Sequence, residues 1–211
     1  MAPRGNPRHG KSSPRGDELK RQRIAAEAAR IMAEEGVSDF QMAKRKAAAR
    51  LNLSEVRNLP GNDEVQAALS EHLRLFHHAE TSRHAERLRH IAVDAMQFLA
   101  QFEPRLVGPV LSGTVTSSSD IQLHVSADAP EQVGFFLQEH QIPFRLAERR
   151  MRFGGDRYKN VATYHFTADD VAIELCVFDL RSARETPLSP VDGRPMKRAN
   201  IKEVETLLAG E

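Results

Sequence analysis

The 211-residue sequence predicts an α+β protein, in which an N-terminal α-helical region is followed by a mixed β-sheet. Up to Pro104 the apolar residues recur at helical spacing, whereas beyond it short apolar runs alternate with turns that contain Gly or Asp. The order there is strand, strand, helix and then a meander, which is typical of a mixed sheet and not of a doubly wound one. We therefore expect a basic tail at residues 1–16, a helical region at 17–83 and an α+β domain at 84–211.

Composition places the chain among ordinary globular proteins. Hydrophobic residues make up 40% of the sequence and charged residues 28%, and the net charge of +1 does not mark the whole chain as a polyanion binder. The single cysteine, Cys176, excludes an internal disulfide and is typical of a reducing compartment. No apolar run approaches the roughly 20 residues that span a bilayer, and the basic N-terminus lacks the apolar segment of a secretory signal. We expect a cytoplasmic protein without a membrane partner.

Residues 1–16 are rich in Pro, Gly, Arg and Ser, and their basic side chains have no acid among them. Such a segment buries too little apolar surface to offset the entropy of ordering, so we expect a disordered tail. This tail is either solvated without a role or makes a weak, salt-sensitive contact with nucleic acid.

Two helices are expected at the start of the helical region. Asp17 can cap the first, which runs to Glu35 and ends at Gly36 as a C′ glycine. Ser38 is a good N-cap for the second, at Asp39–Leu51. The outer face of this second helix is expected to bear Lys44, Arg45, Lys46 and Arg50.

The turn at residues 51–54 gives this region some resemblance to a helix-turn-helix. The would-be recognition helix, Ser54–Leu59, stops at Pro60 and is too short to fill a major groove well. A packed helical appendage with a solvated basic face is the alternative to DNA binding. A long helix is then expected at Asp63–Phe102, with a bend around Glu80–Arg83 where the apolar pattern thins.

The second half of the chain supplies the sheet. Pro130 begins a helix that runs to His140, and Asn200 caps a final helix that ends at Ala209. Tight turns separate the later strands and indicate hairpins. The expected strands are Arg105–Leu111, Asp120–Ser126, Ile142–Phe153, Arg157–Phe166 and Val171–Phe178.

Polar residues interrupt two of these apolar strands. Because side chains alternate along a strand, Asp120, Gln122 and His124 are expected on one face, opposite the core. Glu174 lies in the middle of the last strand, where an unpaired carboxylate would be costly. We expect either a metal ion or an arginine from a neighbouring strand to neutralise it. The neighbouring arginines are Arg149, Arg150 and Arg152.

Residues 106–125 resemble the signature of the nucleotidyltransferase superfamily, which has the DNA polymerase β-like fold. That signature is an apolar strand ending in Gly-Ser, a second glycine shortly after it, and then Ser-Asp-hydrophobic-Asp-hydrophobic, with a third carboxylate on a later strand. Gly108 stands at the first glycine, Gly113-Thr114 at the second, and Ser119-Asp120-Ile121 at the start of the acidic strand. The resemblance covers about residues 84–180 and makes Glu174 the candidate third carboxylate.

The resemblance implies binding of a nucleoside triphosphate with Mg²⁺, or Mn²⁺, and transfer of a nucleoside monophosphate to a protein, an RNA or a small molecule. Asp120 and Glu174 would be the catalytic carboxylates, and with Gln122 they would be the metal ligands. Arg194 and Lys197, in a C-terminal loop, are further candidates for contact with the triphosphate. The candidate phosphate-binding residues of the signature are Gly108, Gly113, Thr114, Ser118 and Ser119.

Two positions depart from the family pattern. Pro109 replaces the serine of Gly-Ser and offers neither a hydroxyl nor a backbone N–H. Gln122 replaces the second acid, so a metal there loses one negative charge. The alternatives are therefore a one-metal enzyme and a catalytically inactive relative that binds a nucleotide, a nucleic acid or a protein. A helix-turn-helix regulator is a third hypothesis.

Overall fold

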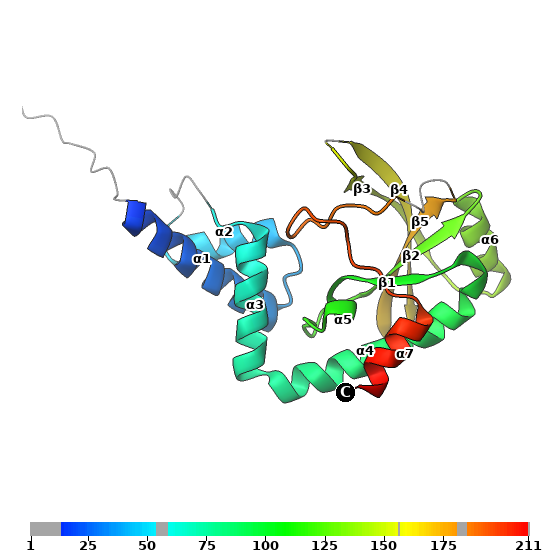
Figure 1. Ribbon diagram of the computed structural model, residues 1–211, viewed down its shortest axis with the longest axis horizontal. Helices are drawn as coiled ribbons and strands as arrows, with labels where there is room; N and C mark the ends of the chain where they lie inside the picture. The colour runs from blue at the N-terminus through cyan, green and yellow to red at the C-terminus, as the bar shows by residue number, and fades with distance from the viewer. Residues whose placement is uncertain (1–13, 54–58, 156, 181–184, 211) are drawn as a thin grey trace, which may run out of the picture.

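A computed structural model describes residues 14–53, 59–155, 157–180 and 185–210 (Figure 1). An N-terminal helical region leads into a five-stranded mixed sheet with helices, which confirms the predicted α+β class. Within the described ranges, no helix has the length and apolarity needed to cross a bilayer.

Three helices form the N-terminal region: α1 (Pro14–Glu35), α2 (Phe40–Arg50) and α3 (Asn62–Phe76). Gly36 has a φ of +69° and follows α1 as predicted. Asp39, and not Ser38, caps α2, because its carboxylate accepts the Met42 N–H at 2.6 Å. The three helices share one core, whose fully buried members are Ile24, Ala28, Ile31, Ala43, Ala47 and Val65.

Some expectations fall outside the described residues. These are the conformation of the tail at residues 1–13 and most of the would-be recognition helix, at residues 54–58. Residues 14–16, which we expected in the tail, belong to α1.

The expected helix Asp63–Phe102 is divided in the structure. After α3, the non-helical backbone of His77 (φ −133°) separates it from α4 (His78–Phe98), and a short 3-10 turn, η1 (Ala100–Phe102), follows. The buried side chains of α3 belong to the helical core, whereas those of α4 belong to the core under the sheet. One straight helix cannot serve both cores, so the bend comes earlier than Glu80.

The sheet has the strand order β1-β2-β5-β4-β3. Strands β2 and β5 pair in parallel, and all other neighbours are antiparallel. The strands are β1 (Arg105–Val107), β2 (Ile121–Ala127), β3 (Arg145–Arg152), β4 (Tyr158–Ala168) and β5 (Val171–Asp179).

The first strand is shorter than predicted. It ends at Val107 because Gly108 adopts a φ of +74° and Pro109 begins the short helix α5 (Gly108–Ser112). Proline fits the first turn of a helix, where its missing N–H is not needed, and it is unsuited to a central strand. The turn therefore starts directly at the predicted phosphate-binding glycine.

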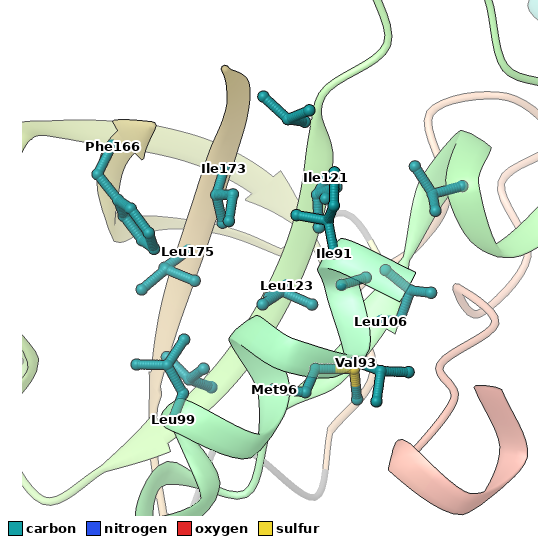
Figure 2. Close-up of a cluster of buried hydrophobic side chains, with 14 of the residues drawn as sticks. Ile91, Val93, Met96, Leu99, Leu106, Ile121, Leu123, Phe166, Ile173 and Leu175 are labelled. Atoms are coloured by element: carbon teal, nitrogen blue, oxygen red, sulfur yellow. The ribbon is translucent and has the colours of Figure 1, made fainter. Parts of the chain in front are cut away.

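Helices cover one face of the sheet. Figure 2 shows Met96 of α4, and Leu99 just after its end, beside Leu123 and Leu175, which are fully buried strand residues. Helix α6 (Glu131–Glu139) contributes to the same core, and α7 (Ile201–Ala209) packs on α4 (Figure 1). As predicted, Asn200 caps α7: its side chain accepts the Glu203 N–H at 3.0 Å. The other face of the sheet is left for the candidate site.

Candidate functional site

A row of polar side chains crosses the sheet on the face opposite the helices. Gln122 on β2 pairs directly with Glu174 on β5, which in turn pairs with His165 on β4. Directly opposed residues project from the same face of a sheet, and Asp120, two residues before Gln122, is the residue just before β2. We refer to Asp120, Gln122, Glu174 and His165 as the polar row. The alternation of β2 and β5 thus brings two of the three predicted metal ligands, Gln122 and Glu174, side by side.

Asp120 and Glu174 act on each other electrostatically. Asp120 is an exposed residue, yet partial burial of its carboxyl group, followed by the negative charge of Glu174, raises its pKa. His165 has a smaller, opposite effect on the pKa of Asp120. The charge of Glu174 therefore acts on Asp120, the other predicted catalytic carboxylate.

Glu174 already has a cationic partner. Its side chain is 13% exposed, and the Arg149 guanidinium of β3 donates to its Oε1. The Cys176 thiol also lies 3.5 Å from this oxygen, within hydrogen-bond reach. The arginine expected as an alternative to a metal ion is thus Arg149. The other two candidates point elsewhere: Arg150 lies over the ring of Tyr158, and Arg152 lies near Gly193.

Gly108 and Gln122 lie in contact, which joins the predicted phosphate loop to the polar row. A Cβ built on Gly108 would lie 2.5 Å from the Gln122 Oε1. The glycine therefore lets the carboxamide approach the turn between β1 and α5. Gln122 fills the space next to the turn, in the position where the resemblance places a second acid.

Replacing Gly108 by alanine is expected to lower the free energy of unfolding by about 1–3 kcal/mol, because its backbone is left-handed and its new methyl group would press on Gln122. Gly155 is the matched control, since its φ is +72° but nothing lies within 4 Å of its built Cβ. Urea unfolding should show a larger loss for Gly108→Ala than for Gly155→Ala. The excess should disappear in a Gln122→Ala background, and equal losses in both backgrounds would refute the contact.

Several hydroxyl groups of α5 and of the loop between α5 and β2 form hydrogen bonds within the protein. Ser112 Oγ and Thr114 Oγ1 are 2.8 Å apart, and Ser119 Oγ accepts the Thr116 N–H at 2.9 Å. Ser118 Oγ donates to the Gly36 carbonyl at 3.0 Å and so attaches the loop to the end of α1. Of the predicted phosphate donors, Ser118 and Ser119 thus have structural partners, whereas Thr114 shares a bond with Ser112 on the exposed side of the loop.

Arg89 is a supporting residue that the sequence pattern did not single out. It is buried in α4, its Nε donates to the Val110 carbonyl of α5 at 3.1 Å, and burial lowers its pKa. A Cβ on Gly113, where φ is +76°, would lie 3.2 Å from the Arg89 Nη2. A signal was present, because Arg89 lies at helical spacing between the core residues Ala85 and Ala92.

His124 lies beside the polar row in a cationic environment. It is only 3% exposed, its ring centroid is 4.8 Å from that of Phe178, and its Nδ1 has no hydrogen-bond partner among the residues that the structure describes. Burial, followed by the charges of Arg198 and Arg149, lowers its pKa to about 3. His124 is therefore a neutral imidazole at physiological pH. The alternation of β2 predicted its face, but not its burial.

The two cations predicted in the C-terminal loop are not brought to the polar row. Arg194 and Lys197 are both exposed, and the described residues contain no ion pair between either side chain and the polar row. The loop instead reaches the helical region, where the Asn62 side chain donates to the Pro190 carbonyl at 2.8 Å. Figure 1 shows this loop, in orange, extending toward α2.

The expected solvated basic face of α2 is largely neutralised. Lys44 is buried and donates to the Pro60 carbonyl, while Lys46 and Arg50 form ion pairs with acids of α1. Packing of α2 against α1 explains the difference, because it brings Glu27 and Glu35 beside this face. Arg45 alone of the four remains exposed without a partner among the described residues.

Neither the arrangement of possible metal ligands nor comparison with known proteins assigns a further role to these residues. Within the described ranges, no group of three or more His, Cys, Asp or Glu side chains is arranged to hold a metal ion. Comparison of the chain with protein-family models, with curated proteins and with solved structures finds no match. Function is therefore inferred from the residues of this chain alone.

Proposed function

We propose that this chain is a nucleotidyltransferase-like protein that binds a nucleoside triphosphate with Mg²⁺ on the polar-row face and transfers a nucleoside monophosphate to an acceptor. The observation that carries this proposal is the placement of the predicted ligands: Gln122 pairs with Glu174 across β2 and β5, and Asp120 precedes β2. Burial, followed by the charge of Glu174, raises the pKa of Asp120, which agrees with this placement. Two carboxylates that repel each other favour a bound cation.

The donor atoms of the polar row suit Mg²⁺. Asp120 and Glu174 offer carboxylate oxygens and Gln122 a carbonyl oxygen, and Mg²⁺ prefers oxygen ligands completed by waters and substrate phosphates. Because Arg149 holds Glu174, whereas Asp120 forms no ion pair within the described ranges, Asp120 is the carboxylate that would bind first. The neutral Gln122 favours one cation over two. When bound, such an ion polarises the phosphoryl group that is transferred.

The triphosphate is proposed to lie beside the turn between β1 and α5. Pro109 removes one backbone donor there, so the Ser112 and Thr114 hydroxyls are the polar groups that would replace it. Both hydroxyls can donate to phosphate oxygens once their mutual hydrogen bond is exchanged. Arg149, between the polar row and the helical region, adds a positive charge at the same face.

Label transfer from radiolabelled nucleoside triphosphates, in the presence of Mg²⁺ or Mn²⁺ and cell extract, tests this function. The wild-type protein should modify an acceptor, and Asp120→Asn should lower the rate by at least about 100-fold, since a lost metal ligand removes several kcal/mol of transition-state stabilisation. Asp128→Asn is the matched control, because Asp128 is exposed beyond the far end of β2. Transfer that survives Asp120→Asn would rule out this site as its source.

A second candidate is a nucleotide-binding protein without catalytic activity. The Arg149–Glu174 ion pair favours it, because a guanidinium already supplies the positive charge that a metal ion would bring to Glu174. In this case nucleoside triphosphates should raise the unfolding temperature, by more at higher concentration and for tighter binding, while no label is transferred. Transfer that depends on Asp120 would exclude this candidate.

A further inference from the structure

A cavity of about 650 Å³ lies between the helical region and the edge strand β3. Three parts of the chain line it: Lys44 with the start of α3, residues 149–152 of β3 with Tyr158, and residues 188–193 with Met196. This volume falls within the range of sites for small ligands. The cavity shares Arg149 with the neighbourhood of Glu174, but none of the polar row lines it.

The lining of the cavity is predominantly basic. Among the residues that the structure describes, it is lined by one lysine and three arginines and by two acids, Asp63 and Asp192. Asp192 already accepts the Arg194 N–H at 3.1 Å. Arg150 and Arg152 have no acidic partner among the described residues, whereas Arg149 is paired with Glu174. The excess of positive charge favours an anionic ligand.

The buried Lys44 ammonium group can donate a hydrogen bond to an anion in this cavity. Lys44 is only 4% exposed, and its ammonium group donates to the Pro60 carbonyl at 3.1 Å and to the Asn62 Oδ1 at 2.8 Å. An ammonium group has three donors, so one N–H is left without an acceptor among the described residues. Burial lowers the pKa of Lys44, which an anion in the cavity would counteract.

Tyr158 and Arg150 provide a planar surface at the same cavity. The Arg150 guanidinium lies 4.3 Å from the centroid of the Tyr158 ring, and Tyr158 is 50% exposed. Guanidinium planes and aromatic rings both stack on nucleobases. Tyr164, the other tyrosine, is unsuited to this role because it is buried and donates to the Pro130 carbonyl.

We propose that this cavity is a second ligand site, which binds a small nucleoside phosphate with its phosphates toward Lys44 and Arg152 and its base against the Arg150–Tyr158 pair. A bound ligand would contact both the helical region and the sheet, and so hold the two together. The site is independent of the function proposed above, because it requires neither Asp120 nor group transfer.

The site can be tested by calorimetric titration of the full chain with adenosine triphosphate. A metal chelator is present, so that metal-dependent binding at the polar row does not contribute. Arg152→Ala should weaken binding by at least about tenfold, the loss expected for one hydrogen bond to a charged group. Arg152→Lys should retain part of the affinity. Asp120→Asn and Arg23→Ala, an exposed position on α1, should bind as the wild type does.

Three results would overturn the site. The first is no binding of adenosine triphosphate by the wild-type protein at millimolar concentration. The second is an equal loss in Arg152→Ala and Asp120→Asn, which would move the binding to the polar row. The third is a ten-nucleotide RNA that binds more than 100-fold more tightly than the mononucleotide, which would indicate a nucleic-acid groove. Unchanged urea unfolding of each variant excludes misfolding as the cause of a loss.

Discussion

Replacing Arg149 by methionine is expected to lower the free energy of unfolding by about 2 kcal/mol. The substitution keeps an apolar stem but leaves Glu174, whose side chain is 13% exposed, without its cation. Breaking a fully buried pair costs about 3–5 kcal/mol, and the smaller value applies because Arg149 is 37% exposed. Urea unfolding at neutral pH, without divalent metal, measures this loss.

The same variant reports on metal binding. Because Arg149→Met frees Glu174, millimolar Mg²⁺ should stabilise this variant more than it stabilises the wild-type protein. The double variant Arg149→Met/Glu174→Gln should regain most of the lost stability and should respond to Mg²⁺ no more than the wild-type protein does. A double variant as unstable as Arg149→Met, or a single variant indifferent to Mg²⁺, would contradict the competition between guanidinium and metal at Glu174.

Acid is expected to destabilise the fold through His124. Its pKa is about 3 in the folded protein against an ordinary value of 6.5, so below pH 6.5 the unfolded chain takes up a proton that the folded protein does not. The stability that the neutral His124 contributes to the fold is complete above pH 6.5 and is lost as the pH falls toward 3. By pH 4.5 this loss amounts to about 3 kcal/mol.

Replacing His124 by phenylalanine should remove this loss. The new ring can pack on Phe178, and the buried Nδ1 that it replaces has no hydrogen-bond partner in the described part of the chain. The variant should therefore unfold much like the wild type at pH 7 and be about 3 kcal/mol more stable than it at pH 4.5. His90→Phe, at an exposed position of α4, controls for general effects of the substitution. A stability difference that does not change with pH would show that folding does not lower the pKa of His124.

Local patterns in the sequence predicted the α+β class and much of the polar row. Alternation placed Gln122 on the face of its strand opposite the core and marked Glu174 as a carboxylate that needs a partner, and the structure makes the two direct neighbours. Caps were also readable where side chain and backbone signals agree, as at Gly36 and Asn200. These features depend on residues within one element, which is why a single sequence is sufficient to predict them.

Features that depend on register or on distant segments were not predictable in this way. Which arginine meets Glu174 depends on the pairing of β3 with β4, and a shift of one residue would turn Arg149 to the other face. The cavity at Lys44 requires Asn62 to meet Pro190, which is 128 residues away. The bend at His77 likewise depends on tertiary packing, because α3 packs into the helical core and α4 into the core under the sheet.

The most direct test of the polar-row site is calorimetric titration with a Mg²⁺–nucleoside triphosphate in an Arg152→Ala background, which suppresses the second site. We expect binding that needs Mg²⁺ and that weakens by at least about tenfold when Asp120→Asn is added, because a charged metal ligand is lost. Adding Asp128→Asn instead should leave the affinity unchanged. Failure of all four nucleoside triphosphates to bind, or Mg²⁺-dependent binding that Asp120→Asn does not weaken, would contradict the proposed site.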